Sequence, residues 1–211
     1  GFWTHVAIYL GDLEILDDFF KENQLFSGRT FSQYLATEDP DAYKGLLGKD
    51  KDGNPYSVIE AKRPGVILDS LESSAHVDSL ALLSVKNLSS EDRLTIVLGA
   101  LKHLGRPYDY NFDFTTDNAF VCSELVYKAY KPTGKLTLEL ETLNGRPMVS
   151  PNSFVKKFRT EQNSNSSELE LLLFLDGDER ERVAKGASVD EFVTSADRPK
   201  WNALRQLARL N

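Results

Sequence analysis

The chain has 211 residues, of which 41% are hydrophobic, so it is long enough to bury a sizeable core. Its formal net charge of −7, with no cluster of Lys and Arg, argues against a nucleic acid or an anionic lipid surface as the main partner. Cys122 is the only cysteine, which excludes an intramolecular disulfide framework and a multi-cysteine metal site.

The first predicted elements are short strands separated by a long insertion. Residues 3–11 alternate with a period of two residues, which predicts a strand with His5 on the face opposite the aliphatic side chains. Residues 12–55 are helical and irregular and end in the turn-rich GKDKDGNP, as expected of an insertion between strands. YSVIEA at 56–61 predicts the next strand, which RPG stops, and SLALLSV at 79–85 predicts a buried strand.

Two helices follow. Ser89 and Ser90 are both suitable N-caps for the first, in which apolar residues recur at helical spacing (Leu94, Val97, Leu98 and Leu101). Gly105 and Pro107 close this helix. Residues 106–119 predict an aromatic loop. A second helix begins at Cys122, which therefore lies in its first turn.

The C-terminal part adds a strand and a helix. Residues 160–167 are polar and predict a loop, ELELLLFL at 168–175 a core strand, and residues 199–210 an amphipathic helix. The fold class is therefore α+β. We expect a single domain over 1–211 with the insertion at 12–55 and a C-terminal extension at 160–211.

The chain begins inside a predicted strand, without an initiator Met or a signal peptide. Its longest apolar run, 171–175, is far shorter than the roughly 18 residues that a transmembrane span needs. We expect a fragment or a processed form, in which any membrane association would come from segments outside this sequence. The absence of a signal peptide or a span therefore does not indicate the cellular compartment of the protein.

Cys122 is the candidate nucleophile. A thiol becomes more reactive when its pKa falls, which happens at a helix N-terminus and beside an imidazolium. Of the three histidines, His103 precedes the helix stop and His76 lies in an acidic loop, and both have ordinary structural explanations. His5 is the preferred base, because a strand histidine beside a helix cysteine is the arrangement of cysteine hydrolases.

Glu60 is the candidate orienting residue. It lies in the middle of a short apolar strand, where a carboxylate is costly unless it is paired. A carboxylate that accepts from an imidazole would provide that pairing and fix the imidazole tautomer. The alternative is a glutamate that faces water from an edge strand.

Four segments in order, THVAIYLG, YSVIEAKRPGV, ALKHLGRPYDYNFDF and FVCSELVYKAY, resemble the permuted papain-like amidases of the YiiX/YaeF type, circular permutants within the NlpC-like branch of papain-fold hydrolases. The resemblance runs from about residue 3 to 130, with a weaker continuation at 150–158. It implies a papain-like fold with the cysteine-bearing helix packed on an antiparallel sheet. The order histidine, acidic residue, cysteine is the permuted one.

The resemblance implies roles for individual residues. Cys122 would be the nucleophile, His5 the general base and Glu60 the residue that orients His5. Tyr108, in the RPYDY segment, would be a partner of the thiolate or oxyanion, although a tyrosine that packs the loop is the alternative. The family usually has a further strand before the histidine strand, so one edge of the site would come from residues absent here.

The leading functional hypothesis is hydrolysis of a peptide or isopeptide amide, such as those of cell-wall peptides, through a thioester. This favours a bacterial cell envelope over the cytoplasm, a peptide or acyl-amide substrate as the partner, and no cofactor, because no metal-binding spacing is present. One alternative is a lipid acyltransferase or thioesterase, with aromatic side chains of the insertion as a lid (Phe19, Phe20, Phe26, Phe31 and Tyr34). An ordinary satellite core is the other interpretation of these aromatic side chains, and the preferred one. Another alternative function is a catalytically silent binding module.

Overall fold

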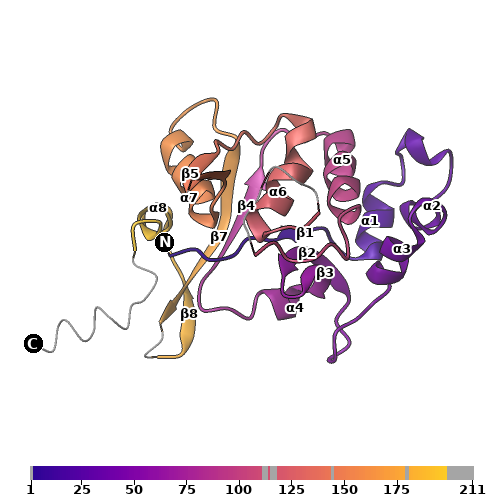
Figure 1. Ribbon diagram of the computed structural model, residues 1–211, viewed down its shortest axis with the longest axis horizontal. Helices are drawn as coiled ribbons and strands as arrows, with labels where there is room; N and C mark the ends of the chain where they lie inside the picture. Colours follow the sequence, from indigo (N-terminus) through magenta and orange to yellow (C-terminus); the bar gives the residue numbers. More distant parts are fainter. Residues whose placement is uncertain (1, 111–113, 115–117, 144, 179–180, 199–211) are drawn as a thin grey trace, which may run out of the picture. The chain divides into compact units, whose positions relative to one another are not determined.

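The computed structural model describes residues 2–110, 114, 118–143, 145–178 and 181–198 (Figure 1). The chain divides into two compact units, each built from separate stretches of sequence. The first unit comprises Gly1–His5, Asp78–Lys86 and Ser150–Asn211, and the second Val6–Val77 and Asn87–Val149. Helices and antiparallel sheets occur in both, so the fold is α+β, as expected.

A three-stranded antiparallel sheet forms the centre of the second unit. Its order is β1 (Ile8–Tyr9), β2 (Tyr56–Lys62) and β3 (Gly65–Ser70), with β2 in the middle. Ile59 of β2 is fully buried and pairs with Ile8 on one side and Leu68 on the other, so these side chains form an apolar face. The strand expected over 3–11 is much shorter, since only Ile8 and Tyr9 pair. β3 was not predicted.

The two predicted helices are present. α5 (Ser90–Leu101) begins at Ser89, whose hydroxyl accepts the Asp92 N–H, and Gly105 with φ of 78° follows its end. α6 (Cys122–Tyr130) lies beside α5, and Gly99 of α5 faces the backbone of Ala129 (Figure 1). A 3-10 turn, η2 (Lys131–Thr133), and a small hairpin of β5 (Glu141–Leu143) and β6 (Arg146–Met148) follow.

The insertion at 12–55 is a helical subdomain of the second unit. It contains α1 (Leu13–Phe19), η1 (Gln24–Phe26), α2 (Phe31–Glu38) and α3 (Pro40–Leu46), which cluster around one another (Figure 1). Phe20, Phe26 and Phe31 are almost fully buried, and the Phe31 ring lies within 5.9 Å of the other two. These rings form a satellite core, which is the ordinary alternative to a lid. The short α4 (Leu71–Ser74) follows β3.

The first unit is built on the sheet β4 (Leu80–Val85), β7 (Leu169–Asp178) and β8 (Val183–Gly186), which is antiparallel throughout. β4 and β7 lie where the two core strands are predicted, but only Val85, Leu169 and Phe174 in them are buried. The helices of this unit are α7 (Pro151–Glu161) and α8 (Val189–Ser195). The ring of Phe192 on α8 packs 5.5 Å from Phe174 of β7 and 5.9 Å from Trp3.

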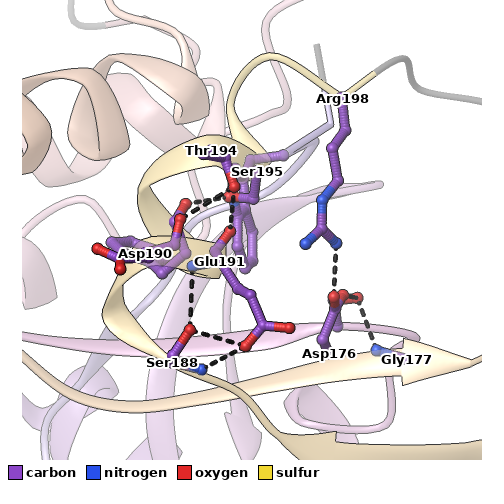
Figure 2. A network of polar contacts seen from close by, with 11 residues as sticks. Asp176, Gly177, Ser188, Asp190, Glu191, Thr194, Ser195 and Arg198 are labelled. Carbon is purple, nitrogen blue, oxygen red and sulfur yellow. Dashed lines mark hydrogen bonds and ion pairs between the residues drawn. The ribbon is translucent and has the colours of Figure 1, made fainter.

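Polar contacts hold the end of α8 at the sheet. Ser188 caps the helix and exchanges hydrogen bonds with Glu191, and the Arg198 guanidinium binds Asp176 of β7 at 2.6 Å (Figure 2). The helix expected over 199–210 lies outside the described residues.

Candidate active site

Cys122 is the first residue of α6, as the sequence predicts. Its side chain is buried, and the preceding Val121 has the extended backbone of an N-cap, with φ of −96°. The neighbouring Ser123 donates its hydroxyl hydrogen to the carbonyl of Val149, which fixes the first turn. A thiol at this position lies beside backbone N–H groups that have no partner within the helix.

Tyr108 lies beside the chain that leads into α6. It forms a parallel bridge with Phe120, two residues before Cys122. The Phe120 N–H donates to the carbonyl of Pro107 at 2.9 Å, and the Asp109 N–H donates to the carbonyl of Phe120 at 3.0 Å. These backbone hydrogen bonds therefore hold the residues around Tyr108 against the segment that precedes α6.

Burial and nearby charged groups affect the pKa of the Tyr108 phenol. Burial raises the pKa of Tyr108, negative charge at Cys122 raises it further, and the guanidinium of Arg63 opposes both effects. Tyr108 is thus in electrostatic reach of the thiol and of a cation. The role of Tyr108 as a partner of the thiolate or oxyanion stays a prediction.

The tip of the β2–β3 hairpin docks against the segment that carries Tyr108. The Tyr108 N–H donates to the carbonyl of Pro64 at 2.9 Å, and the Val66 N–H donates to the carbonyl of Arg106 at 2.8 Å. Between them, a Cβ atom placed on Gly65 would lie 2.1 Å from the Arg106 carbonyl oxygen. Only glycine permits this approach of two backbones, so Gly65 positions Tyr108 indirectly.

Glu60 is buried on β2, with 2% of its surface exposed. Because β2 is the central strand of its sheet, the alternative of an edge-strand glutamate facing water is wrong. Its Oε1 accepts from the Ser74 hydroxyl at 2.8 Å and lies 2.8 Å from Nζ of Lys62. The pairing that a buried carboxylate requires is therefore supplied, at this oxygen, by lysine and serine.

Lys62 links two carboxylates on one face of the sheet. Its Nζ lies 2.6 Å from the Asp69 carboxylate as well as 2.8 Å from Glu60. Burial lowers the pKa of Lys62, but the hydrogen bonds to Asp69 and Glu60 outweigh this effect, so the pKa is raised overall. Lys62 stays charged and favours an ionised Glu60.

The three histidines occupy different surroundings. His103 is buried with its ring 4.3 Å from that of Phe120, in keeping with its structural explanation. His76 is exposed in the loop after α4. His5 is exposed and belongs to the first compact unit, whereas Cys122 and Glu60 belong to the second. The pairing of His5 with Cys122 stays a prediction, as does its orientation by Glu60.

Glu124 is a buried carboxyl group in the first turn of α6. Burial raises the pKa of Glu124 to about 7, although the ion pair with Lys128 at 3.0 Å opposes the shift. Its other oxygen accepts a long 3.4 Å hydrogen bond from the Val121 N–H. A carboxyl group with a raised pKa thus lies at the start of the helix that carries Cys122.

Four residues of these surroundings are not indicated by the sequence analysis: Lys62, Arg63, Ser74 and Glu124. The alternation of β2 places Lys62 on the same face as Glu60, and this signal was available in the sequence. Ser74 follows Glu60 by fourteen positions and reaches it only through the β2–β3 hairpin and α4. No local pattern indicates such a contact.

The described residues contain neither a metal-binding cluster nor a membrane-spanning helix. No group of three or more His, Cys, Asp or Glu side chains in that part of the chain is arranged to hold a metal ion. None of the described helices combines the length and the apolar character that a membrane crossing requires.

Comparison with known proteins identifies the family. Residues 1–172 match the family described as permuted papain-like amidase enzyme, YaeF/YiiX, C92 family. The chain belongs to this family. The resemblance inferred from the four sequence segments is therefore confirmed, and the protein is a member of a family of cysteine amidases and peptidases.

Two further comparisons add little to this assignment. A crystal structure of metalloprotein yiiX from Escherichia coli O157:H7 is similar at 21% identity and a TM-score of 0.38, over 66% of this chain and 78% of that one. No curated protein matches the chain.

Proposed function

We propose that this permuted papain-like protein hydrolyses a peptide or isopeptide amide through a thioester on Cys122. The observation that carries the proposal is the position of Cys122 at the first residue of α6, with Tyr108 in electrostatic reach. Family membership supports cysteine hydrolase chemistry in general. The finer fold assignment, a cysteine-bearing helix packed on an antiparallel sheet as in NlpC-like enzymes, belongs to the same proposal.

The chemistry requires two transfers. The thiol proton of Cys122 moves to His5, and the sulfur attacks the amide carbon, with the oxyanion held by N–H groups at the start of α6. His5 then protonates the departing amine as the C–N bond breaks, which leaves a thioester. Water, deprotonated by His5, attacks the thioester and releases the acid, and the proton returns to the sulfur.

Tyr108 and Glu60 support these steps without transferring a proton to the substrate. A neutral Tyr108 hydroxyl can donate to the thiolate or the oxyanion, and its raised pKa keeps it protonated at neutral pH. Glu60, buried and paired with Lys62, supplies a fixed negative charge for orienting His5. A cell-envelope location would suit a cell-wall peptide substrate.

The lipid acyltransferase or thioesterase alternative now has less support. It drew on aromatic residues of the insertion as a surface for an acyl chain, but Phe20, Phe26 and Phe31 are buried against one another. Among these aromatic residues, Phe19 is half-exposed, and the Arg93 guanidinium lies over its ring. We therefore favour a peptide amide over a long-chain ester.

Hydrolysis assays on matched substrates test the proposal. The protein should release amine from acyl-peptide amides, and Cys122→Ser should abolish release while keeping the same free energy of unfolding. Lys21→Gln, at an exposed position outside α6, is the control and should retain activity. Activity of Cys122→Ser equal to wild type, or cleavage of long-chain esters but not peptide amides, would contradict the proposal.

A further inference from the structure

The tip of the β2–β3 hairpin carries an arginine that is linked to Tyr108 through a second tyrosine ring. Arg63 is exposed, and its guanidinium carbon lies 5.3 Å from the centre of the Tyr110 ring. The Tyr110 ring meets the Tyr108 ring edge to face, with 5.3 Å between their centres. The three side chains form a row that ends at Tyr108, in electrostatic reach of Cys122.

Backbone contacts hold this row at the nucleophile. Arg63 directly precedes Pro64, whose carbonyl accepts the Tyr108 N–H, and the close approach at Gly65 fixes the hairpin tip against residues 106–108. The backbone of Arg63 is thus placed by the same contacts that place the backbone of Tyr108, and its exposed side chain lies over the Tyr110 ring. A charged side chain that packs on a ring loses less conformational freedom on binding a ligand than an unsupported surface arginine does.

The charge of Arg63 lacks a carboxylate partner within the described part of the chain. Arg159 and Arg198, in contrast, each bind an aspartate at 2.6 Å. A guanidinium placed over an aromatic ring can still direct its N–H groups toward a planar anion. The chain has a net charge of −7, which repels anions as a whole. A cation at Arg63 would offset this repulsion for an anionic group of a substrate bound near Tyr108.

We propose that Arg63, supported by Tyr110, binds a carboxylate of the substrate, so that the preferred substrate is an amide with a free carboxylate on a residue that flanks the scissile bond. This inference rests on the proposed function, because it names the substrate class of the Cys122 site. The guanidinium fork binds a carboxylate through two charge-assisted hydrogen bonds, whereas a carboxamide offers one oxygen and no charge. Arg63 therefore determines specificity and takes no part in proton transfer.

Alkylation of Cys122 by two reagents of similar shape gives the first test. Iodoacetate carries a carboxylate and iodoacetamide does not, so the ratio of their rates cancels the reactivity of the thiol itself. Arg63→Gln should lower the iodoacetate-to-iodoacetamide ratio at least about fivefold, because the attracting charge is lost. Arg106→Gln removes the same charge from the neighbouring segment and should keep the ratio within about twofold. An unchanged ratio in Arg63→Gln, or an equal fall in both variants, would overturn the proposal.

Binding to the Cys122→Ser variant gives a second test that needs no reactive thiol. Calorimetric titration compares acetyl-glutamyl-alanine, which has a carboxylate on each side of its central amide, with acetyl-glutaminyl-alaninamide. The diacid should bind at least about tenfold more tightly, and Arg63→Gln in the same background should remove that preference. Equal affinities, or a preference that survives Arg63→Gln, would reject the carboxylate subsite.

The two tests also separate this inference from the proposed function. An Arg63-dependent preference for the diacid together with an unreactive Cys122 would support the subsite and reject the hydrolase. Cleavage of peptide amides without any carboxylate preference would support the hydrolase and reject the subsite.

Discussion

The ammonium group of Lys62 lies 2.8 Å from the buried carboxylate of Glu60 and holds it in the central strand of its sheet. Replacing Lys62 with Gln leaves Glu60 buried without this cation, so the free energy of unfolding should fall by about 1–3 kcal/mol. Urea unfolding measures the loss. Lys21→Gln breaks the exposed pair with Asp18 and should cost less than about 1 kcal/mol. Equal losses in the two variants would show that the Lys62 ion pair contributes no more than a surface pair.

Glu124 should make the stability depend on pH in an unusual direction. Its pKa is about 7 in the folded protein and near its ordinary value of 4.5 when unfolded, so the folded state binds the proton more tightly. The resulting stabilisation is fully present below pH 4.5 and is lost as the pH rises through 7. Glu124→Gln should therefore gain stability relative to wild type between pH 5 and pH 8, by up to about 3 kcal/mol.

A second glutamate provides the control of opposite sign. Hydrogen bonds from Ser188 lower the pKa of Glu191, so its stabilisation is present above its unfolded pKa and is lost as the pH falls. Glu191→Gln should thus lose stability relative to wild type at neutral pH and approach it in acid. Urea unfolding at pH 5 and pH 8 measures both variants. A Glu124→Gln difference that is the same at both values would contradict the assignment.

Gly65→Ala should disturb the placement of Tyr108. The added Cβ would meet the Arg106 carbonyl oxygen at 2.1 Å, so the backbones must separate, at a cost of at least about 2 kcal/mol. Gly99→Ala is the matched control, because its Cβ would meet nothing closer than 3.7 Å and it lies within α5. That control should stabilise the protein by about 0.5–1 kcal/mol through helix propensity. Thermal unfolding that ranks the two variants in the reverse order would refute this account of the hairpin tip.

The aromatic cluster of the insertion should behave as a core and not as a lid. Phe26 is fully buried, and its truncation to Ala should cost about 3–5 kcal/mol of stability. Phe19 is half-exposed, so Phe19→Ala should cost less than about 1 kcal/mol. Denaturant titration distinguishes the readings. If Phe26→Ala left stability unchanged but altered hydrolysis, the lid would be favoured.

Much of the fold could be predicted from local patterns in the sequence. A serine cap and a helical apolar stripe predict α5, and a continuous apolar run predicts the leucine-rich β7. The sequence RPG predicts the end of a strand, whereas in the structure it is the tip of a hairpin whose return strand is GVILDS, so β3 is not expected from the sequence. The long strand expected over 3–11 pairs only at two residues, because alternation indicates a strand but does not provide a partner.

The candidate site was predicted in part. Cys122 in the first turn of a helix and Tyr108 near it follow from helix signals and from the family resemblance. The pairing of Glu60 with Lys62 and Ser74 depends on the hairpin and α4, and the position of Arg63 depends on a backbone contact at Gly65. Such long-range contacts leave no periodic trace in a single sequence.

The most direct test of the central claim is the rate of Cys122 alkylation by iodoacetamide as a function of pH, in wild type and in His5→Ala. His76→Ala is the matched histidine control. We predict that labelling of the wild type is half-maximal well below the roughly 8.5 of a free thiol, and that only His5→Ala moves this midpoint upward. Labelling that follows a free thiol in all three proteins, or that begins only on unfolding, would contradict the account of Cys122 as a nucleophile activated by His5.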